Sequence, residues 1–273
     1  MKLTSILLEV DGSERCQTRL NIALALAKKH HTQLTGVYAS GEYYFTPVYA
    51  EAPIPIDIVE SCEAQYQAAA IEAEAWFQER CKNTGIPISW QSASGNVDDL
   101  LAKWAHTHDL VIIGQAEGGL LNPDIALQNR LLMKIVRPIL LVPETAGTDI
   151  GRHVLIAWNA SNTAARAVQD ALPLLQAAET VQVLAIQPVD TSERILLADI
   201  CAHLARHGID ASPQETDAEG ADVSDVLLSC CTMRGVDLLI TGGYGHTRLR
   251  EVIFGGVTRS LLNTTTVPVL MSH

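Results

Sequence analysis

The chain has 273 residues, of which 48% are hydrophobic and only 5% aromatic. This length suits two compact domains, and the aliphatic composition is typical of parallel α/β sheets rather than of disordered chains. A net charge of −12 argues against nonspecific binding to nucleic acid. No apolar run is long enough to cross a bilayer, and the N-terminal residues resemble a strand rather than a signal peptide. We therefore expect a cytoplasmic protein.

The first half of the chain alternates between apolar strand patterns and helical patterns. The stretch "SILLEVDGSERC" near residue 5 gives an apolar strand, a turn, and a serine suited to cap the next helix. A Pro- and Tyr-rich loop, "GEYYFTPVYAEAPIPID", follows the second strand and precedes the longest helix, which is expected at 57–83. Strands are predicted near residues 3–10, 33–39, 87–94, 109–114 and 138–143.

The second half repeats this order of signals. The stretch "HVLIAWNASNTA" corresponds to the first strand and turn, and "VDLLITG" corresponds to "HDLVIIG". Asp11 and Asn159 are 148 positions apart, but Gly114 and Gly242 are only 128 apart, so the extra length lies in the middle of the first half. The boundary is expected within "ETAGTDIG" at 144–151. Strands are predicted near residues 152–158, 180–187, 211–217, 236–242 and 267–271.

These alternating segments predict two domains, 1–146 and 150–273, each of them a doubly wound parallel α/β sheet of the Rossmann-like or flavodoxin-like kind. The last short strand of each half follows a proline, and the two could pair with each other at the sheet edge. The domains would then form an intramolecular pseudo-dimer.

The stretch "TGGYGHTRLREVIFGGVTRSLL" of the second half places two glycine clusters around a basic segment. It begins at the end of the predicted fourth strand, on the edge where doubly wound sheets bind their ligands. Glycines expose backbone N–H groups, and a helix N-terminus favours phosphate. The spacing is Gly242-x-x-Gly245, nine residues, and then Gly255-Gly256, with Thr258 able to offer a hydroxyl. The pattern predicts a phosphate cradle, although glycines in tight turns that serve packing alone are the alternative.

This sequence resembles the universal stress protein family in a tandem, HUP-type form, and the resemblance covers both halves. Nucleotide-binding members carry G-x-x-G, nine residues, and then G-S or G-T, with an Asp after the first strand. Gly242, Gly245 and Gly255 fit this pattern. Two positions depart from it, because Gly256 replaces the Ser or Thr and Asn159 replaces the Asp.

The resemblance implies that the second half binds an adenine nucleotide, ATP, with Mg only as the ion that accompanies it. The base is expected near Asn159 and the backbone of Ile186. His246 and Arg248 either approach the phosphates or are solvated loop residues that pair with a neighbour such as Glu251. The expected binding residues are Asn159, Ile186, Gly242, Gly245, His246, Gly255, Gly256, Val257 and Thr258.

The first half keeps Asp11 but lacks the cradle. Glu117 replaces the second glycine, and a carboxylate there would repel a triphosphate by about 1 kcal/mol or more. Ile125 and Ala126 stand where the glycine pair would be. We expect a degenerate nucleotide site, with residues 117–119 forming either a diverged turn or a pocket for another ligand.

No catalytic motif or metal-ligand spacing is present in the sequence, so we expect no catalytic residue and no metal site. The six cysteines form no C-x-x-C pair and are interpreted as buried small hydrophobic residues. Three hypotheses remain. The chain is a stress-response protein whose nucleotide controls binding to an unknown protein partner, a slow nucleotide hydrolase with His246 as general base, or an interaction scaffold with relic glycines. Association of two chains into a homodimer is compatible with each.

Overall fold

The computed structural model describes residues 2–40, 56–115, 123–187, 197–244 and 256–273. In the N-terminal half, strands and helices alternate along the chain as the sequence predicts, and the strand boundaries lie close to the predicted ones. The elements are β1 Ser5–Glu9, α1 Cys16–His30, β2 Gln33–Ser40, α2 Ile56–Cys81, β3 Ile88–Ser94, α3 Val97–Ala105, β4 Leu110–Gly114, α4 Pro123–Lys134 and β5 Ile139–Val142.

The C-terminal half repeats this order, and its second helix is much shorter. Its helix α6 has 9 residues, whereas the corresponding α2 has 26. The elements are β6 His153–Ala157, α5 Asn162–Leu175, β7 Thr180–Gln187, α6 Ala198–Arg206, β8 Ala211–Asp217, α7 Val223–Met233, β9 Leu238–Gly242, α8 Gly256–Thr264 and β10 Val269–Ser272.

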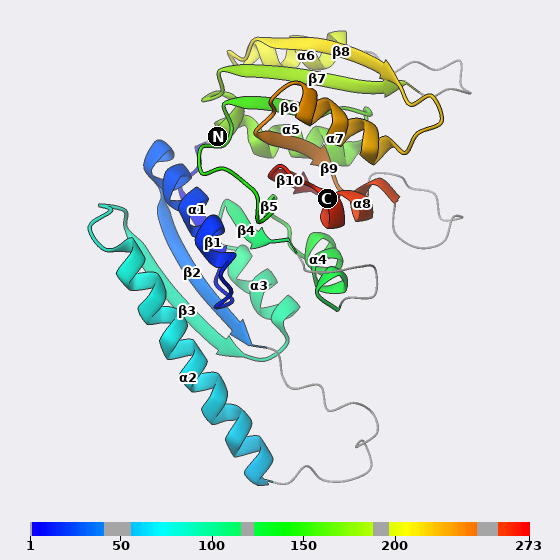
Figure 1. Ribbon diagram of the computed structural model, residues 1–273. Coiled ribbons are helices and arrows are strands. Elements are labelled where there is room, and N and C mark those ends of the chain that lie inside the picture. The colour runs from blue at the N-terminus through cyan, green and yellow to red at the C-terminus, as the bar shows by residue number, and fades with distance from the viewer. Residues whose placement is uncertain (1, 41–55, 116–122, 188–196, 245–255) are drawn as a thin grey trace.

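Both halves contribute to a single ten-stranded sheet, in the order β3-β2-β1-β4-β5-β10-β9-β6-β7-β8. Within each half all described strand pairs are parallel, and helices lie between successive strands along the chain. The order reads the same from either end, so the halves are related by a pseudo-twofold arrangement. The sheet twists strongly, and β7 and β8 run in a different direction from β2 and β3 (Figure 1).

The halves join through their last strands. β5 and β10 pair antiparallel, with Leu140 opposite Leu270. This confirms the prediction that the short strands after prolines pair across the halves. Helices α4 and α8 also contact each other beside this junction, and the Tyr244 hydroxyl is hydrogen-bonded to Asn129 Oδ1. The fold prediction, a doubly wound α/β sheet in each half, is confirmed.

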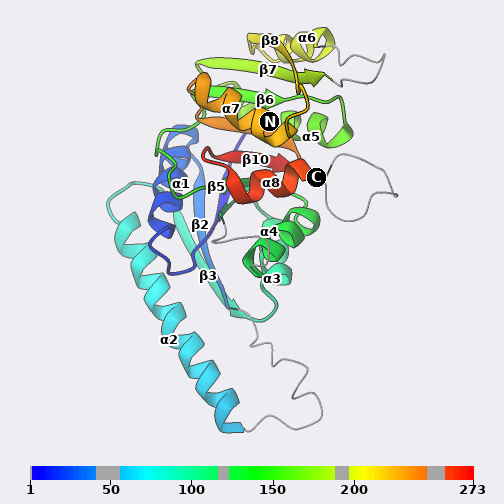
Figure 2. The same cartoon turned by 45° about the vertical axis from the view of Figure 1, so that its right-hand side comes forward.

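Helices cover both faces of the sheet, and two hydrophobic clusters fill the space between. One cluster lies under α1, α2, α5 and α6, and the other under α3, α4, α7 and α8. Figure 2 shows α1 and α2 on one side of the sheet and α3 and α4 on the other. Successive strand residues alternate between the clusters: Ile6 and Leu8 belong to the first, and Leu7 to the second. Four cysteines are buried in these clusters, as the sequence predicts: Cys16, Cys81, Cys230 and Cys231.

Local signals explain where several helices begin. The Ser161 side chain caps α5 by accepting a hydrogen bond from the Ala164 N–H. The Asn96 side chain caps α3 by accepting one from the Asp99 N–H. None of the helices in the described ranges is both long enough and apolar enough to span a membrane.

Candidate functional site at the carboxyl edge of the C-terminal strands

Three of the predicted binding residues meet at the carboxyl edge of β9, β6 and β7, which are neighbours in the sheet. Gly242 ends β9, and Asn159 follows β6 by two residues. Ala157 is opposite Leu184 in the β6–β7 register, so Asn159 comes level with Ile186 two residues further on. The sheet therefore brings these side chains and strand ends together, as expected for the ligand edge of such a fold.

The Asn159 side chain folds back on its own turn. Its Oδ1 accepts hydrogen bonds from the Ser161 N–H at 3.2 Å and from the Ser161 hydroxyl at 2.7 Å. Asp11 makes the same two contacts with Ser13, at 3.0 and 2.7 Å. Because Oδ1 is committed to the turn, the Nδ2 group of Asn159 is the part that can face a ligand, and it can only donate.

Ile186 offers its backbone at this edge. The Trp158 N–H donates to the Leu184 carbonyl, so the peptide groups of Leu184 face β6. Peptide groups two residues apart in a strand face the same side, and those of Ile186 therefore point past the end of β6. A ligand beside Asn159 would meet an N–H and a C=O from the same strand.

Gly242 has a packing role of its own. A Cβ atom at this position would lie 2.5 Å from the Ala164 nitrogen and 2.6 Å from the Thr163 carbonyl carbon. Glycine therefore allows the first turn of α5 to approach the end of β9. For this residue, the alternative that the glycine serves packing is supported by the structure, and a contact with phosphate stays a prediction.

Two amides after Gly242 are already engaged within the protein. The Gly243 N–H donates to the Ser272 carbonyl at 2.8 Å, and the Tyr244 N–H donates to the Thr258 hydroxyl at 3.2 Å. Thr258 is buried and thereby ties the end of β9 to α8. A phosphate would have to be bound by the chain beyond Tyr244 and by the first turn of α8.

The first turn of α8 begins with Gly256, which is exposed, and continues with Val257. A Cβ atom at Gly256 would meet no atom within 4 Å, so the position has room for a larger group. Helix N-termini attract anions through their unpaired N–H groups and dipole. Four residues that the sequence analysis considers near the phosphates lie outside the described residues: Gly245, His246, Arg248 and Gly255.

The corresponding edge of the N-terminal half is occupied by an ion pair. Arg19 of α1 is buried, and its Nη2 lies 2.7 Å from the Asp11 carboxylate. Its guanidinium covers the end of β4, where a Cβ atom on Gly114 would lie 2.0 Å from Nη1. The Gly114 N–H donates to the Glu9 carboxylate at 3.3 Å, and its carbonyl accepts from the Gln128 side chain at 2.5 Å. The protein's own groups thus fill this edge.

The charges in this cluster stabilise one another. Burial alone would raise the pKa of Asp11, but Arg19 and the hydrogen bonds from Ser13 hold that pKa below its ordinary value. Burial opposes the charge on Arg19, yet Glu9 is the largest of the influences that raise its pKa. The group therefore remains an ion pair at neutral pH. The interpretation of this half as a degenerate nucleotide site stays a prediction, and residues 117–119 lie outside the described ranges.

Sequence reasoning missed the role of Arg19. Its neighbours on the same face of α1, Cys16, Leu20 and Ala23, are all buried. An arginine at helical spacing within an apolar stripe is a signal of a buried, paired cation. The equivalent residue in the C-terminal half is the small Ala167.

The described residues contain no group of three or more His, Cys, Asp or Glu side chains placed to bind a metal ion. No metal centre therefore occurs among the described residues.

Comparison with known proteins identifies the C-terminal half. Residues 151–273 match the model of the Universal stress protein family. These residues belong to the universal stress protein family. No curated protein matches the chain.

Solved structures show that the tandem fold is shared. A universal stress protein from Archaeoglobus fulgidus DSM 4304 has 14% identity and a TM-score of 0.77, and the match covers 99% of this chain and 96% of that one. A putative universal stress protein from Pseudomonas aeruginosa UCBPP-PA14 has 13% identity and a TM-score of 0.57, with 99% and 93% covered. A universal stress protein crystallised in complex with cAMP matches 53% of this chain and 99% of its own, at 15% identity and a TM-score of 0.38.

Proposed function

We propose that the C-terminal half binds an adenine nucleotide, ATP, and that the protein acts in the cytoplasmic stress response through a nucleotide-dependent interaction with a partner. The observation that carries this proposal is the contrast between the two carboxyl edges. In the N-terminal half a buried arginine and two carboxylates fill the edge. In the C-terminal half the corresponding core position is Ala167, and the exposed start of α8 at Gly256 has space around it.

The base would lie against the ends of β6 and β7. Adenine presents a donor, its amino group, next to an acceptor ring nitrogen. The C=O and N–H of Ile186 face the gap beyond β6 and match this pair. Asn159 supplies a further donor from Nδ2 in place of the family's carboxylate. Outward-facing groups on two adjacent strands would thus recognise the base.

The phosphates would lie across the glycine segment. Val257 and Thr258 belong to the first turn of α8, where N–H groups lack partners within the helix. The remaining donors would come from Gly245, His246 and Gly255. Since the Gly243 and Tyr244 amides are engaged, the cradle would begin at Gly245, three residues after the end of β9.

The test is equilibrium dialysis of the full chain with labelled ATP. The variant is Gly245→Glu, which introduces the residue that the first half has at the equivalent position, Glu117. We expect saturable binding to the unmodified chain and at least tenfold weaker binding to the variant, because a carboxylate repels the phosphates by about 1 kcal/mol or more and the side chain fills the cradle.

The matched control is Ala205→Glu, which adds the same charge at an exposed position on α6. It should bind ATP as the unmodified chain does. Equal loss in both variants would show a general effect of charge rather than a cradle at Gly245. Absence of saturation at millimolar ATP in the unmodified chain would overturn the proposal.

A further inference from the structure

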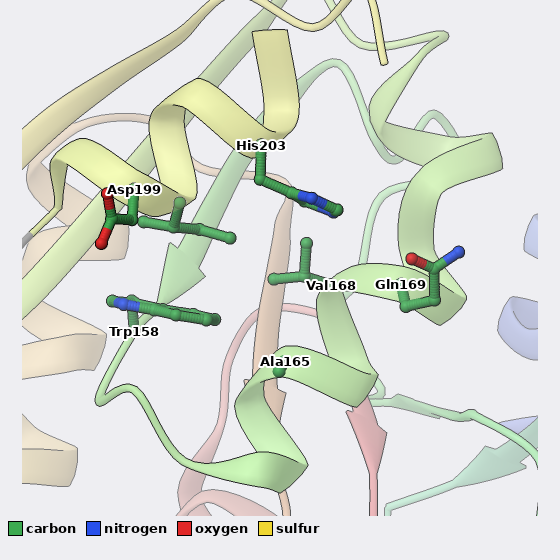
Figure 3. A pocket seen from close by; sticks show the side chains of 7 residues that line it. Trp158, Ala165, Val168, Gln169, Asp199 and His203 are labelled. Atoms are coloured by element: carbon green, nitrogen blue, oxygen red, sulfur yellow. The ribbon is translucent and has the colours of Figure 1, made fainter. Parts of the chain in front are cut away.

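A hollow of about 320 Å³ lies between α5 and α6 of the C-terminal half. Figure 3 shows the Trp158 indole on one side of it and α6 above, with His203 directed across the opening and Val168 and Ala165 on the α5 side. The volume is within the range of about 300–1,000 Å³ typical of small-molecule sites. Its lining residues are Trp158, Ala165, Val168, Gln169, Asp199, Ile200 and His203.

This hollow is separate from the proposed nucleotide site. Trp158 and Ile200 belong to the hydrophobic cluster under α5 and α6, whereas Ile186 and Val257 pack with the cluster on the opposite face. Trp158 packs with the cluster under α5 and α6, whereas the side chain of the following Asn159 is hydrogen-bonded within its own turn.

The N-terminal half has large side chains at the corresponding place. The helix ends align because Gly85-Ile86 matches Gly208-Ile209, which pairs Trp76 with Asp199 and Phe77 with Ile200. Phe77 is completely buried and packs against Trp90.

The same alignment pairs Arg80 with His203, and the α1–α5 alignment pairs Gln17 with Ala165. Arg80 lies with its guanidinium carbon 4.4 Å from the Trp76 ring centroid, and its Nε donates to the Gln17 side chain at 2.5 Å. The N-terminal half therefore fills this place with its own cation stacked on an indole. In the C-terminal half, shorter side chains leave the place open, and the indole there comes from Trp158, the residue after β6.

The rim of the hollow is negative. Asp199 is exposed in the first turn of α6, and no ion pair to it occurs among the residues that the structure describes. Its carboxylate lies above the nitrogen-bearing end of the Trp158 indole (Figure 3). Burial lowers the pKa of His203, and His207 and Arg206 lower it further, so this imidazole is neutral at neutral pH. Asp199 is then the charged group among the lining residues.

We propose that this hollow binds a small organic cation, an amine or guanidinium attached to a flat or aliphatic body. The body lies on the indole of Trp158 and against Val168 and Ile200, and the cationic group faces Asp199. Indole faces attract cations, and a carboxylate at the rim fixes the orientation of the ligand. The ligand takes the place that Arg80 occupies in the N-terminal half.

The probe for this site is 2-phenylethylamine, followed by ¹⁵N NMR of the full chain. The chain has four tryptophans, and the indole N–H signal of Trp158 is assigned by its loss in Trp158→Leu. We expect a saturable shift of that signal by the amine. Phenylacetate, an anion of similar size, should bind at least tenfold more weakly, and Asp199→Asn should weaken amine binding at least fivefold.

A filling variant tests the position of the ligand. Ala165→Gln copies Gln17 into an exposed site on the rim of the hollow and should weaken amine binding. The matched control is Ala205→Gln, an exposed change on α6 outside the lining residues, which should leave binding unchanged. Gly245→Glu should also leave amine binding unchanged, so failure here is distinct from failure of the nucleotide proposal. The inference is overturned if amine and carboxylate bind alike, if the two glutamine variants bind alike, or if millimolar amine leaves the Trp158 signal in place.

Discussion

The two halves share a fold but differ in the side chains at the carboxyl ends of their strands. In the N-terminal half, Arg19 crosses the end of β4 and pairs with Asp11. In the C-terminal half, Ala167 takes the place of Arg19, and the start of α5 packs directly against Gly242. The turn after the first strand is nevertheless preserved, since Asp11 and Asn159 accept the same hydrogen bonds.

This difference shows how two halves with one fold can differ at a strand edge with little change of scaffold. In the N-terminal half a buried cation, Arg19, makes the polar contacts at this edge. On the same face of the sheet, between α1 and α2, Arg80 fills a place that is open beside Trp158 in the C-terminal half. In the first comparison the backbone of α5 comes close to Gly242 in place of the arginine, and in the second the place of the arginine is open.

The largest expected effect comes from removing the buried cation. Arg19→Ala leaves Glu9 and Asp11 close together without their partner, and should lower the free energy of unfolding of the N-terminal half by about 3 kcal/mol. Urea unfolding followed by tryptophan fluorescence measures this, because three of the four tryptophans lie in that half. Arg15→Ala, which removes a more exposed pair with Glu144, is the control and should cost less than about 1 kcal/mol. Equal losses in the free energy of unfolding for the two variants would contradict the view that Arg19 closes the edge.

The glycines that end the fourth strands should differ in their tolerance of a methyl group. In Gly242→Ala the new Cβ meets backbone atoms of Thr163 and Ala164, which cannot move without shifting α5. In Gly114→Ala it meets the flexible end of Arg19. We expect a loss of about 3 kcal/mol in the free energy of unfolding for the first variant and about 1 kcal/mol for the second. Thermal or urea unfolding of the two variants side by side gives the order, and the reverse order would refute the packing argument.

The smallest expected effect concerns the turn after the first strand. Gly12 has φ 74°, and Ala160 holds the equivalent position with φ 57°. This left-handed conformation costs a residue with a Cβ about 1–2 kcal/mol. Ala160→Gly, which copies the first half, should therefore raise the free energy of unfolding by up to about 1 kcal/mol after the added chain entropy. The reciprocal Gly12→Ala should lower it, and a loss of stability in both variants would show that the turns are not equivalent.

The sequence was sufficient to predict the fold because its signals are local. The inner strands are apolar runs bounded by polar or turn residues, and the prolines before β5 and β10 mark the strands that pair between the halves. The convergence of Asn159, Ile186 and Gly242 follows from strand order alone. By contrast, the closure by Arg19 and the hollow beside Trp158 depend on how helix side chains meet a neighbouring strand or helix. Those contacts are set by side-chain volume and direction in three dimensions, which spacing along the chain does not show.

The most direct test of the account is the number of ATP molecules bound per chain, measured by native mass spectrometry over a titration. The account predicts one ATP per chain at saturation for the unmodified protein and none at the same concentration for Gly245→Glu. Two ATP molecules per chain would show that the Arg19 edge is open to nucleotide. Undiminished binding of one ATP to Gly245→Glu would show that the C-terminal glycine segment is not the site.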